Sequence, residues 1–466
     1  MEKEINKDES FRDSIATINQ EGNREYVFPK KPKGKLHNYR LIVSWFLLAF
    51  FFFTPFIKIN EEPLFLFDVI SRKFILFGQI FWPQDTYLFA VMMLTLIVFT
   101  VVFTVSLGRL WCGWACPQTI FMEMVFRKIE YWIDGDANKQ RRLAKQNWDF
   151  EKSWKRLLKY FIFAIIALLI SNTLFAWVIG IDRLFEIMHE PIPENKAAFI
   201  AMMLLSGFLM FVYSWFREQV CLIMCPYGRL QSVLLDSNTI VVAYDYIRGE
   251  PRGNFKKGEN RRDADKGDCI DCRACVEVCP TAIDIRNGTQ LECVNCTACI
   301  DACNHTMDRV GQPRGLVRFD SEKGISTGKK LRLNARLIAY IAVLLALFTF
   351  LNILLFSRSD VEATILRTPG LLFQDQENGQ ISNLYNIKVV NKQREQFPIE
   401  VKLLSHEGRI VMAAGDMIVK PAELTEGVFF VYLNKAEVSG KIPIRLGVFT
   451  NNELIEEIHL TFVGPN

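Results

Sequence analysis

The chain has 466 residues, of which 50% are hydrophobic and 23% are charged, and its formal net charge is +4 at pH 7. A charge this close to balance gives no electrostatic basis for nucleic-acid binding, so no nucleic-acid partner is expected. The apolar residues are concentrated in long stretches, and the length and number of these stretches exclude a wholly soluble protein.

The chain begins with a polar segment, residues 1–40, which is followed by a predicted membrane domain, residues 41–240. Stretches long and apolar enough to cross a bilayer cover residues 41–57, 87–107, 160–181, 197–216 and 337–356. About forty mostly hydrophilic residues precede the first stretch, which is therefore predicted to be an anchor and not a cleaved signal. The apolar segment 64–82 contains charges and is predicted to be an interfacial helix or loop on the outer side.

The distribution of Lys and Arg predicts how the spans are oriented. Basic residues gather in the segments 30–40, 108–159 and 329–336, whereas the loops 58–86 and 182–196 contain few of them. Basic loops stay on the cytoplasmic side of a membrane. The pattern therefore predicts a cytoplasmic N-terminus, a cytoplasmic domain before the fifth span and a C-terminal domain outside.

One cysteine motif occurs twice, each time just past the predicted cytoplasmic end of a span. The two copies are Cys112-Gly-Trp-Ala-Cys116-Pro and Cys221-Leu-Ile-Met-Cys225-Pro. The repetition predicts a duplicated two-span unit in which each copy delivers one CxxxCP motif to the inner face. The proline after each second cysteine predicts a turn or a helix start there.

The chemistry of these four cysteines has several interpretations. On one helix, thiolates at i and i+4 share a face, where they could grip a soft metal such as Cu(I) or cycle between dithiol and disulfide. Arg109 and Arg217 are predicted to lower the thiol pKa values. Alternatively, the cysteines are small buried apolar residues at a membrane boundary. The candidate catalytic and copper-binding residues are Cys112, Cys116, Cys221 and Cys225.

The other eight cysteines lie in the segment 269–320, after a charged, glycine-containing linker, residues 241–268, that is predicted to be a tether. They form two runs with the x2-x2-x3 spacing that is typical of a double [4Fe–4S] ferredoxin. In such runs the fourth cysteine faces the cluster of the other run. The predicted ligand sets are Cys269, Cys272, Cys275 and Cys303 for one cluster, and Cys293, Cys296, Cys299 and Cys279 for the second.

Paired cysteines have two other common uses, zinc binding and disulfide formation. Paired CxxC sites often bind zinc, but two copies of the full ferredoxin spacing make zinc a remote choice. A disulfide framework conflicts with the reducing compartment that the charge pattern predicts. The second run is followed by Asn304 where the first has Pro280, a change that removes no ligand.

Residues 361–466 contain no cysteine and are predicted to form short strands between turn signals. About seven strands in about a hundred residues predict an immunoglobulin-like sandwich, for which a docking role is a hypothesis. The predicted fold is therefore a multi-domain membrane protein. It combines a five-helix α transmembrane domain, an α+β double [4Fe–4S] ferredoxin module and a C-terminal all-β immunoglobulin-like sandwich.

Taken in this order, the parts resemble the CcoG/FixG/RdxA family of cytochrome oxidase accessory polyferredoxins. The strings that carry the resemblance are Trp111-Cys-Gly-Trp-Ala-Cys116-Pro-Gln-Thr, Cys225-Pro-Tyr-Gly-Arg229 and Asn383-Leu-Tyr-Asn-Ile-Lys-Val-Val-Asn391-Lys392. The resemblance extends from about residue 35 to the end and implies two [4Fe–4S] clusters in a bacterial inner-membrane protein with a periplasmic C-terminal domain. It also implies reduction of Cu(II) to Cu(I) during assembly of a cbb-type oxidase. The implied partners are a copper importer or copper chaperones and the oxidase subunits, besides an unidentified cytosolic electron donor.

Two other functions remain open at this point. The protein could be a quinol dehydrogenase or electron conduit, because its spans offer apolar surface for a quinone. It could instead be a non-enzymatic, redox-sensing scaffold for oxidase assembly. Nucleotide or flavin binding has no support, because neither a GxGxxG before a helix nor a P-loop occurs.

Overall fold

The computed structural model describes residues 17–465 apart from residues 19–20, 22, 60–61, 69–72, 83–84, 192, 257–258, 260, 262, 329–334, 359–360, 369–372, 377–378, 393–394, 414, 416, 421–423 and 451–452. Residues 1–16 of the polar N-terminal segment and the basic run 329–334 therefore lie outside the described residues. The chain divides into two units, Met1–Val69 with Phe89–Leu351, and Ile70–Leu88 with Asn352–Asn466.

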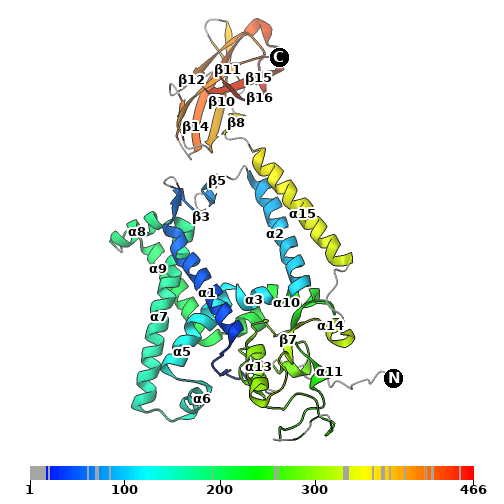
Figure 1. The fold of residues 1–466 in the computed structure, drawn as a ribbon. Coiled ribbons are helices and arrows are strands. Elements are labelled where there is room, and N and C mark those ends of the chain that lie inside the picture. The colour runs from blue at the N-terminus through cyan, green and yellow to red at the C-terminus, as the bar shows by residue number, and fades with distance from the viewer. Residues whose placement is uncertain are drawn as a thin grey trace. The chain divides into compact units, whose positions relative to one another are not determined.

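The helices follow one another along the chain as shown in Figure 1. They are α1 (Lys35–Phe53), α2 (Thr86–Leu107), α3 (Leu110–Trp114), α4 (Pro117–Ile120), α5 (Arg127–Ile133), α6 (Ala137–Lys145), α7 (Phe150–Ile179), α8 (Ile181–His189), α9 (Lys196–Phe211), α10 (Pro226–Leu234), α11 (Tyr246–Gly249), α12 (Ala274–Glu277), α13 (Ala298–Val310), α14 (Glu322–Thr327) and α15 (Ala335–Phe356). Short 3-10 or π segments are η2 (Thr54–Phe56), η4 (Phe121–Phe126), η5 (Val212–Phe216), η6 (Val220–Met224) and η7 (Ile285–Asn287).

Five helical segments of the described chain are long and apolar enough to cross a membrane, and the protein is a membrane protein. They are Lys35–Phe56, Thr86–Leu107, Phe150–Ile179, Lys196–Phe216 and Ala335–Phe356. Each overlaps one predicted stretch, but α7 begins ten residues before the apolar stretch does. Asp149 explains the early start, because its side chain accepts a hydrogen bond from the Lys152 N–H at 2.8 Å and caps the helix.

Helices α7 and α9 lie side by side in the membrane domain (Figure 1). The buried side chains of α7 include Phe163, Ala167, Ile170 and Ser171, whose spacing of four, seven and eight residues defines one helix face. The Ser171 hydroxyl donates to the Met202 carbonyl of α9 at 3.2 Å. One apolar face of α7 therefore forms the contact between these two spans.

An aromatic core continues from α7 toward the segments that carry the CxxxCP motifs. Phe126 of η4 stacks on Tyr213 of η5 with ring centroids 4.4 Å apart, and it meets Phe163 edge-on at 4.8 Å. Phe121 joins the same core. Because aromatic rings bury large areas in fixed geometries, this core fixes the short helices that follow each span.

The ferredoxin module is closed by strands on both sides of its cysteine runs. Strand β6 (Val241–Tyr244) pairs antiparallel with β7 (Val317–Asp320), in the register Val241 to Asp320. The core beneath them contains Val242, Ile283, Ile285, Ile300, Met307 and Leu316. The small remaining strands of this unit are β1 (Lys58–Ile59), β2 (Glu62–Pro63) and β3 (Phe65–Asp68).

The linker 241–268 is not the free tether that the sequence predicted. Residues 241–244 form β6, and the buried Arg261 donates to the carbonyls of Gly253 and Cys269 at 3.1 and 3.0 Å. Arg248 donates to the Arg314 carbonyl at 2.9 Å. Since these arginines satisfy backbone carbonyls of the module, the charged segment belongs to the module and not to a linker.

The apolar segment 64–82 is also not an interfacial helix. Its described residues form β3, β4 (Lys73–Leu76) and β5 (Gln79–Phe81), and Leu76 pairs with Gln79 across a two-residue turn. Phe77 and Gly78 both have positive φ, 53° and 72°. Two such residues make the tight turn that suits a β-hairpin, and the aromatic and β-branched residues around it favour strands.

Two antiparallel sheets form the C-terminal domain, and the predicted immunoglobulin-like sandwich is confirmed (Figure 1). One sheet has the order β12-β14-β10-β8 with β9 beside β10, and the other has the order β13-β11-β15-β16. The strands are β8 (Val361–Arg367), β9 (Gln374–Asp375), β10 (Gln380–Asn391), β11 (Phe397–Leu403), β12 (Gly408–Met412), β13 (Met417–Val419), β14 (Leu424–Asn434), β15 (Lys441–Thr450) and β16 (Glu453–Val463). Tyr385 and Phe429 are fully buried between the sheets, with their rings stacked at 5.7 Å.

Candidate functional site

The two cysteine runs of the ferredoxin module have the same backbone conformation. Asp271 and Asn295, two residues after the first cysteine of each run, have φ of 54° and 52°. Arg273 and Thr297, one residue after the second cysteine, have φ of 55° and 67°. Left-handed residues at these positions turn successive N–H groups toward one side and create a concave site for an anion. Helices α12 and α13 start directly afterwards.

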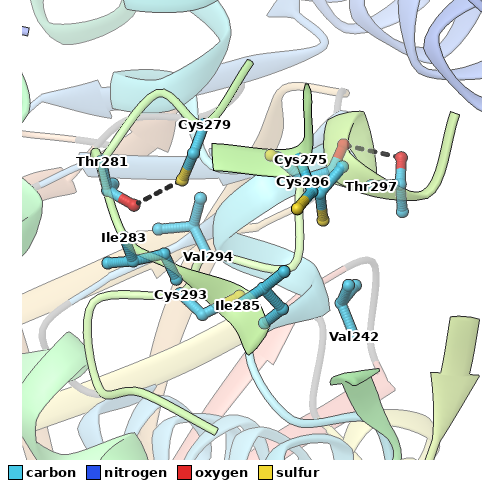
Figure 2. Close-up of a pocket in the computed structure, with 11 residues that line it drawn as sticks. Val242, Cys275, Cys279, Thr281, Ile283, Ile285, Cys293, Val294, Cys296 and Thr297 are labelled. Carbon is cyan, nitrogen blue, oxygen red and sulfur yellow. Dashed lines mark hydrogen bonds between the residues drawn. The ribbon is translucent and has the colours of Figure 1, made fainter. Parts of the chain in front are cut away.

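The second predicted ligand set surrounds one cavity, shown in Figure 2. The cavity contains about 340 Å³ of empty space. Its apolar wall includes Val242, Ile283, Ile285 and Val294, and Cys275 of the other set also reaches it. The set itself is Cys279, Cys293, Cys296 and Cys299, all of which line this cavity.

The first predicted set is also gathered in one place. Burial raises the pKa of Cys303 to about 12, and the neighbouring thiols of Cys269 and Cys272 add to the rise. Burial likewise raises the pKa of Cys275 to about 12, with Cys303 and Cys269 among its neighbours. The fourth cysteine of the second run therefore lies beside the first three of the first run, as the ligand assignment requires.

The donor groups around both sets suit iron–sulfur clusters. Backbone N–H groups of Thr281 and Ile283 face Cys279, and that of Val317 faces Cys303. Within the described residues, no three His, Cys, Asp or Glu side chains converge as ligands of a single ion. A cubane instead takes one thiolate on each of four irons, so its ligands surround a volume. The assignment of ligands to two clusters stays a prediction, and the residues fit it.

Thr281 provides a direct test of this geometry. Its hydroxyl lies 3.4 Å from the Cys279 sulfur (Figure 2) and is the donor when Cys279 is a thiolate ligand. Hydrogen bonds to ligand sulfur raise a cluster's reduction potential. In Thr281→Val we therefore expect the midpoint potential of one of two clusters to fall in an EPR-monitored redox titration.

The matched control is Thr306→Val, whose hydroxyl lies 3.9 Å from the Cys272 sulfur and donates to the Ala302 carbonyl at 3.1 Å. The shift of the midpoint potential in Thr306→Val should be much smaller than in Thr281→Val. Equal potentials in Thr281→Val and the unmodified protein would contradict the assignment of Cys279 as a ligand.

In each CxxxCP motif the structure places a helix break at the second cysteine. Cys116 and Cys225 have extended backbones, with ψ of 125° and 108°, and each immediately precedes a helix that begins with proline. The predicted turn or helix start is therefore present. The prediction that both cysteines share one helix face is wrong, because Cys112 lies in α3 and Cys116 before α4.

The fold nevertheless brings the two motifs together. Burial raises the pKa of Cys221 to about 12, and the neighbouring thiols of Cys116 and Cys112 contribute to that rise. Burial also raises the pKa of Cys112, with Cys116 and Cys225 as neighbours. The Cys112 thiol lies 3.1 Å from Gln231 Oε1 of α10, the helix that follows the second motif. The thiols of four cysteines from two distant segments thus lie near one another, and we call this group the CxxxCP site.

The net pKa values of Cys112 and Cys221 are raised, although Arg109 and Arg217 were predicted to lower the thiol pKa values. Arg109 lowers the pKa of Cys112, but burial outweighs it and the net pKa is raised. Arg217 is committed elsewhere, since its guanidinium donates to both carboxylate oxygens of Glu130 at 3.0 and 2.7 Å. A metal bound at Cys112 or Cys221 therefore has to displace a proton.

The CxxxCP site lies directly against the second ligand set. Cys112 belongs to the same buried cluster as Val294 and Cys296. A Cβ on Gly113 would overlap the Val294 carbonyl and lie 3.0 Å from the Cys296 nitrogen. The Arg109 guanidinium also donates to the Leu291 carbonyl. The membrane domain and the ferredoxin module therefore meet at the loop that carries Cys293 and Cys296.

A second cavity opens at this junction. It contains about 340 Å³ of empty space, and Cys221, Met122 and Glu123 of the membrane domain face Pro280 and Thr281 of the ferredoxin module across it. The cavity leaves space for something the size of a water molecule or a metal ion beside a CxxxCP thiol. Sequence reasoning did not find it, because it is formed by segments far apart in the chain.

Sequence reasoning also missed a buried network of charges around the site. Arg217 and Lys159 both contact Glu130, at 2.7 and 3.7 Å. Lys159 also pairs with Asp134 at 2.7 Å, and Arg127 pairs with Glu123 at 2.8 Å. In the sequence these residues look like solvated charges near a membrane, and nothing in their local pattern predicts burial.

Three family models match the chain. They are a 4Fe-4S binding domain over residues 89–139, a 4Fe-4S dicluster domain over residues 216–322, and the IG-like fold at the C-terminus of FixG over residues 351–465. The first match contains Cys112 and Cys116, and the second contains the other ten cysteines.

Curated relatives cover most of the chain. It is 34% identical to Protein RdxB of Cereibacter sphaeroides, over 88% of this chain and 89% of that protein. Protein RdxA of the same organism is 35% identical, over 80% of this chain and 81% of its own length. Nitrogen fixation protein FixG of Rhizobium meliloti is 30% identical, over 87% and 84%. A crystal structure of a FixG-related protein from Vibrio parahaemolyticus is 20% identical over 23% of this chain and 97% of its own, with a TM-score of 0.20.

Proposed function

The chain belongs to the family of RdxA, RdxB and FixG, and from this premise we propose that it reduces Cu(II) to Cu(I) for assembly of a cbb-type oxidase. That it is a membrane-bound iron–sulfur electron-transfer protein follows from its family, its matched 4Fe-4S domains and its apolar helices. The proposal adds the substrate, the site of its reduction and the purpose.

One observation carries the proposal, and it is the contact between the CxxxCP site and the second ligand set. Gly113 of the first motif packs on the backbone of Val294 and Cys296 without room for a methyl group. A bound [4Fe–4S] cluster supplies electrons one at a time. A metal ion held at the CxxxCP site is therefore next to a source of the single electron that converts Cu(II) to Cu(I).

The side chains of the CxxxCP site favour the product of this reaction. Cysteine thiolates and methionine thioethers are soft ligands that select Cu(I). The junction cavity offers both, because Cys221 and Met122 line it together. Stronger binding of Cu(I) than of Cu(II) by such ligands assists the reduction.

The proposal also includes location and partners. The gathering of Lys and Arg in the segments 30–40 and 108–159 supports a cytoplasmic position for the ferredoxin module. The proposed membrane is a bacterial inner membrane, with the C-terminal domain in the periplasm. The proposed partners are a copper importer or copper chaperones, the oxidase subunits and a cytosolic electron donor. The immunoglobulin-like domain is the proposed docking element.

The test is a double variant, Cys112→Ser with Cys221→Ser, in purified protein that retains both clusters. We expect Cu(II) reduction driven by dithionite-reduced protein to fall at least about a hundredfold, because two soft ligands are lost. Cu(I) is measured with a colorimetric chelator, and iron and sulfide are measured to confirm the clusters.

Met188→Leu is the control, because this sulfur is exposed in α8 and should leave the rate unchanged. An unchanged rate in the double variant would rule out copper reduction at the CxxxCP site. Oxidation of a quinol analogue in membranes, without reduction of Cu(II), would instead favour a quinol dehydrogenase.

A further inference from the structure

A groove with a basic lining lies between the ferredoxin module and the segment that precedes α1. It contains about 1520 Å³ of empty space between the segment that precedes α1 and helix α13. We call it the basic groove. Its charged lining consists of the basic residues Lys30, Lys31, Lys33, Lys35, Arg309 and Arg314 and the acidic residues Asp301 and Asp308.

The two acidic residues of the basic groove are engaged within the protein. Asp301 is buried and accepts hydrogen bonds from the backbone N–H groups of Leu36 and His37 at 3.3 and 2.8 Å. Asp308 pairs with Arg314 at 2.6 Å. The groove therefore presents an excess of positive charge, and Lys31, Lys33 and Arg309 are exposed in it.

The basic segment is fixed to the module. Asp301 of α13 caps the start of α1, and Gly34 makes this possible because a Cβ at that position would overlap the Asp301 side chain. Lys33 and Lys35 flank this glycine. Their positions beside α13 therefore result from a specific contact as well as from their nearness to the membrane.

The basic groove also reaches the first predicted ligand set. It is lined by Ala274 and Thr306, and the Thr306 hydroxyl lies 3.9 Å from the Cys272 sulfur. All twelve cysteines are described, and Cys272 is the exposed one. The second ligand set contacts the CxxxCP site, whereas the first ligand set includes the exposed Cys272 beside the groove residue Thr306.

We propose that the basic groove is the docking site for an acidic, one-electron carrier protein. The inference deepens the proposed function by naming the class of donor and the place where it docks. One electron leaves the carrier per encounter and is accepted at the Cys272 side of the module, with no bond made or broken. Opposite charges steer such an encounter and speed it most at low salt.

Anionic lipid is the competing occupant, since Lys31, Lys33 and Lys35 lie near a membrane span. Arg309 and Arg314 favour the carrier, because they come from α13 and the loop after it and not from the segment beside the span. The exposed Cys272, whose sulfur lies 3.9 Å from the hydroxyl of the groove residue Thr306, also favours an electron carrier.

The experiment uses the full chain with its clusters, in nanodiscs of neutral phosphatidylcholine, and a plant-type [2Fe–2S] ferredoxin as the acidic probe. Carbodiimide joins carboxylates to lysines in contact, and mass spectrometry locates the joined residues. We expect links from the ferredoxin to Lys31, Lys33 or Lys35. The groove variant Lys31→Gln, Lys33→Gln, Arg309→Gln should bind the ferredoxin at least about tenfold more weakly. Added salt should weaken ferredoxin binding by the unmodified protein to a similar extent.

The matched control removes the same number of charges from exposed positions of α6, with Lys139→Gln, Arg142→Gln and Lys145→Gln. It should bind the ferredoxin normally. Absence of ferredoxin binding, links confined to other lysines, or equal weakening in both variants would overturn the proposal. The proposal would also be overturned if the groove variant bound the ferredoxin normally but no longer bound phosphatidylglycerol vesicles. That result would make the groove a lipid site.

Dithionite separates this inference from the proposed function, because it reduces the clusters without docking. The groove variant should reduce Cu(II) at the normal rate when dithionite supplies the electrons. Failure of the unmodified protein to reduce Cu(II) under these conditions would remove the proposed substrate, and the docking result would still stand.

Discussion

Glu130→Gln is expected to lower the free energy of unfolding by about 3–5 kcal/mol, the usual cost of removing one partner from a buried ion pair. Glu130 is 5% exposed and accepts two hydrogen bonds from Arg217, which is 4% exposed. The amide keeps the shape of the side chain but removes the carboxylate that binds Arg217 through two hydrogen bonds, and the buried Arg217 keeps the longer 3.7 Å contact with Glu218. Lys159 loses a second contact but keeps Asp134. Thermal unfolding in detergent measures the loss.

Glu186→Gln is the matched control, because its pair with Arg183 has side chains more than half exposed. Exposed pairs contribute little to stability, so this variant should unfold like the unmodified protein. Equal stabilities of Glu130→Gln and Glu186→Gln would contradict the buried network.

The same pair predicts an acid limit to stability. Burial alone would raise the pKa of Glu130, but Arg217 and Lys159 more than offset it and hold the pKa below its usual range. A lowered pKa in the folded state stabilises the protein above the unfolded value of about 4.3. This contribution is lost as the pH falls from there through the lowered value, and in Glu130→Gln that part of the acid transition should be absent.

Gly113→Ala is expected to slow Cu(II) reduction at least about tenfold, equivalent to about 1.4 kcal/mol of added barrier. The new methyl group would overlap the Val294 carbonyl and press on the Cys296 nitrogen, 3.0 Å from its Cβ. Both neighbours are backbone atoms, so the CxxxCP site and the cluster loop have to separate. Cluster content and reduction by dithionite should be unchanged, and stopped-flow absorbance after addition of Cu(II) gives the rate.

Gly207→Ala makes the same chemical change in helix α9, where no described residue outside the helix's own backbone comes within 4 Å of the new Cβ. Alanine favours helix over glycine by about 1 kcal/mol at both positions, so intrinsic propensity predicts no loss. A slow Gly113→Ala beside a normal Gly207→Ala would assign the effect to the junction. Normal rates in both would show that the junction does not set the rate.

The parts of this fold that depend on local patterns are predictable from the sequence. The five apolar stretches and the immunoglobulin-like strands are examples, because hydrophobic length and alternation act over neighbouring residues. The two cysteine runs are also predictable, because their spacing is a local pattern. The left-handed residues Asp271 and Asn295 occupy the same position in each run, which agrees with the repeated spacing. The linker prediction for 241–268 was wrong because β6 pairs with a distant strand and Arg248 binds the distant Arg314 carbonyl. The hairpin at Phe77-Gly78 was missed because only Gly78 is a usual turn residue.

The candidate site is predictable only in its components. The four CxxxCP cysteines can be chosen by their repeated motif, but their convergence joins segments about a hundred residues apart. The contact of Gly113 with Val294 spans even more of the chain, and no periodic pattern encodes it. Arg217 shows the same limit: its partner is Glu130 and not a thiol, which is decided by the packing of η5 against η4, the segment just before α5.

The most direct measurement is EPR spectroscopy of the anaerobically purified, dithionite-reduced protein, freed of excess reductant and titrated with Cu(II). Progressive loss of the reduced-cluster signal, with no Cu(II) signal until the clusters are oxidised, is the outcome expected of a copper reductase. A Cu(II) signal that grows from the first addition beside undiminished cluster signals would contradict it.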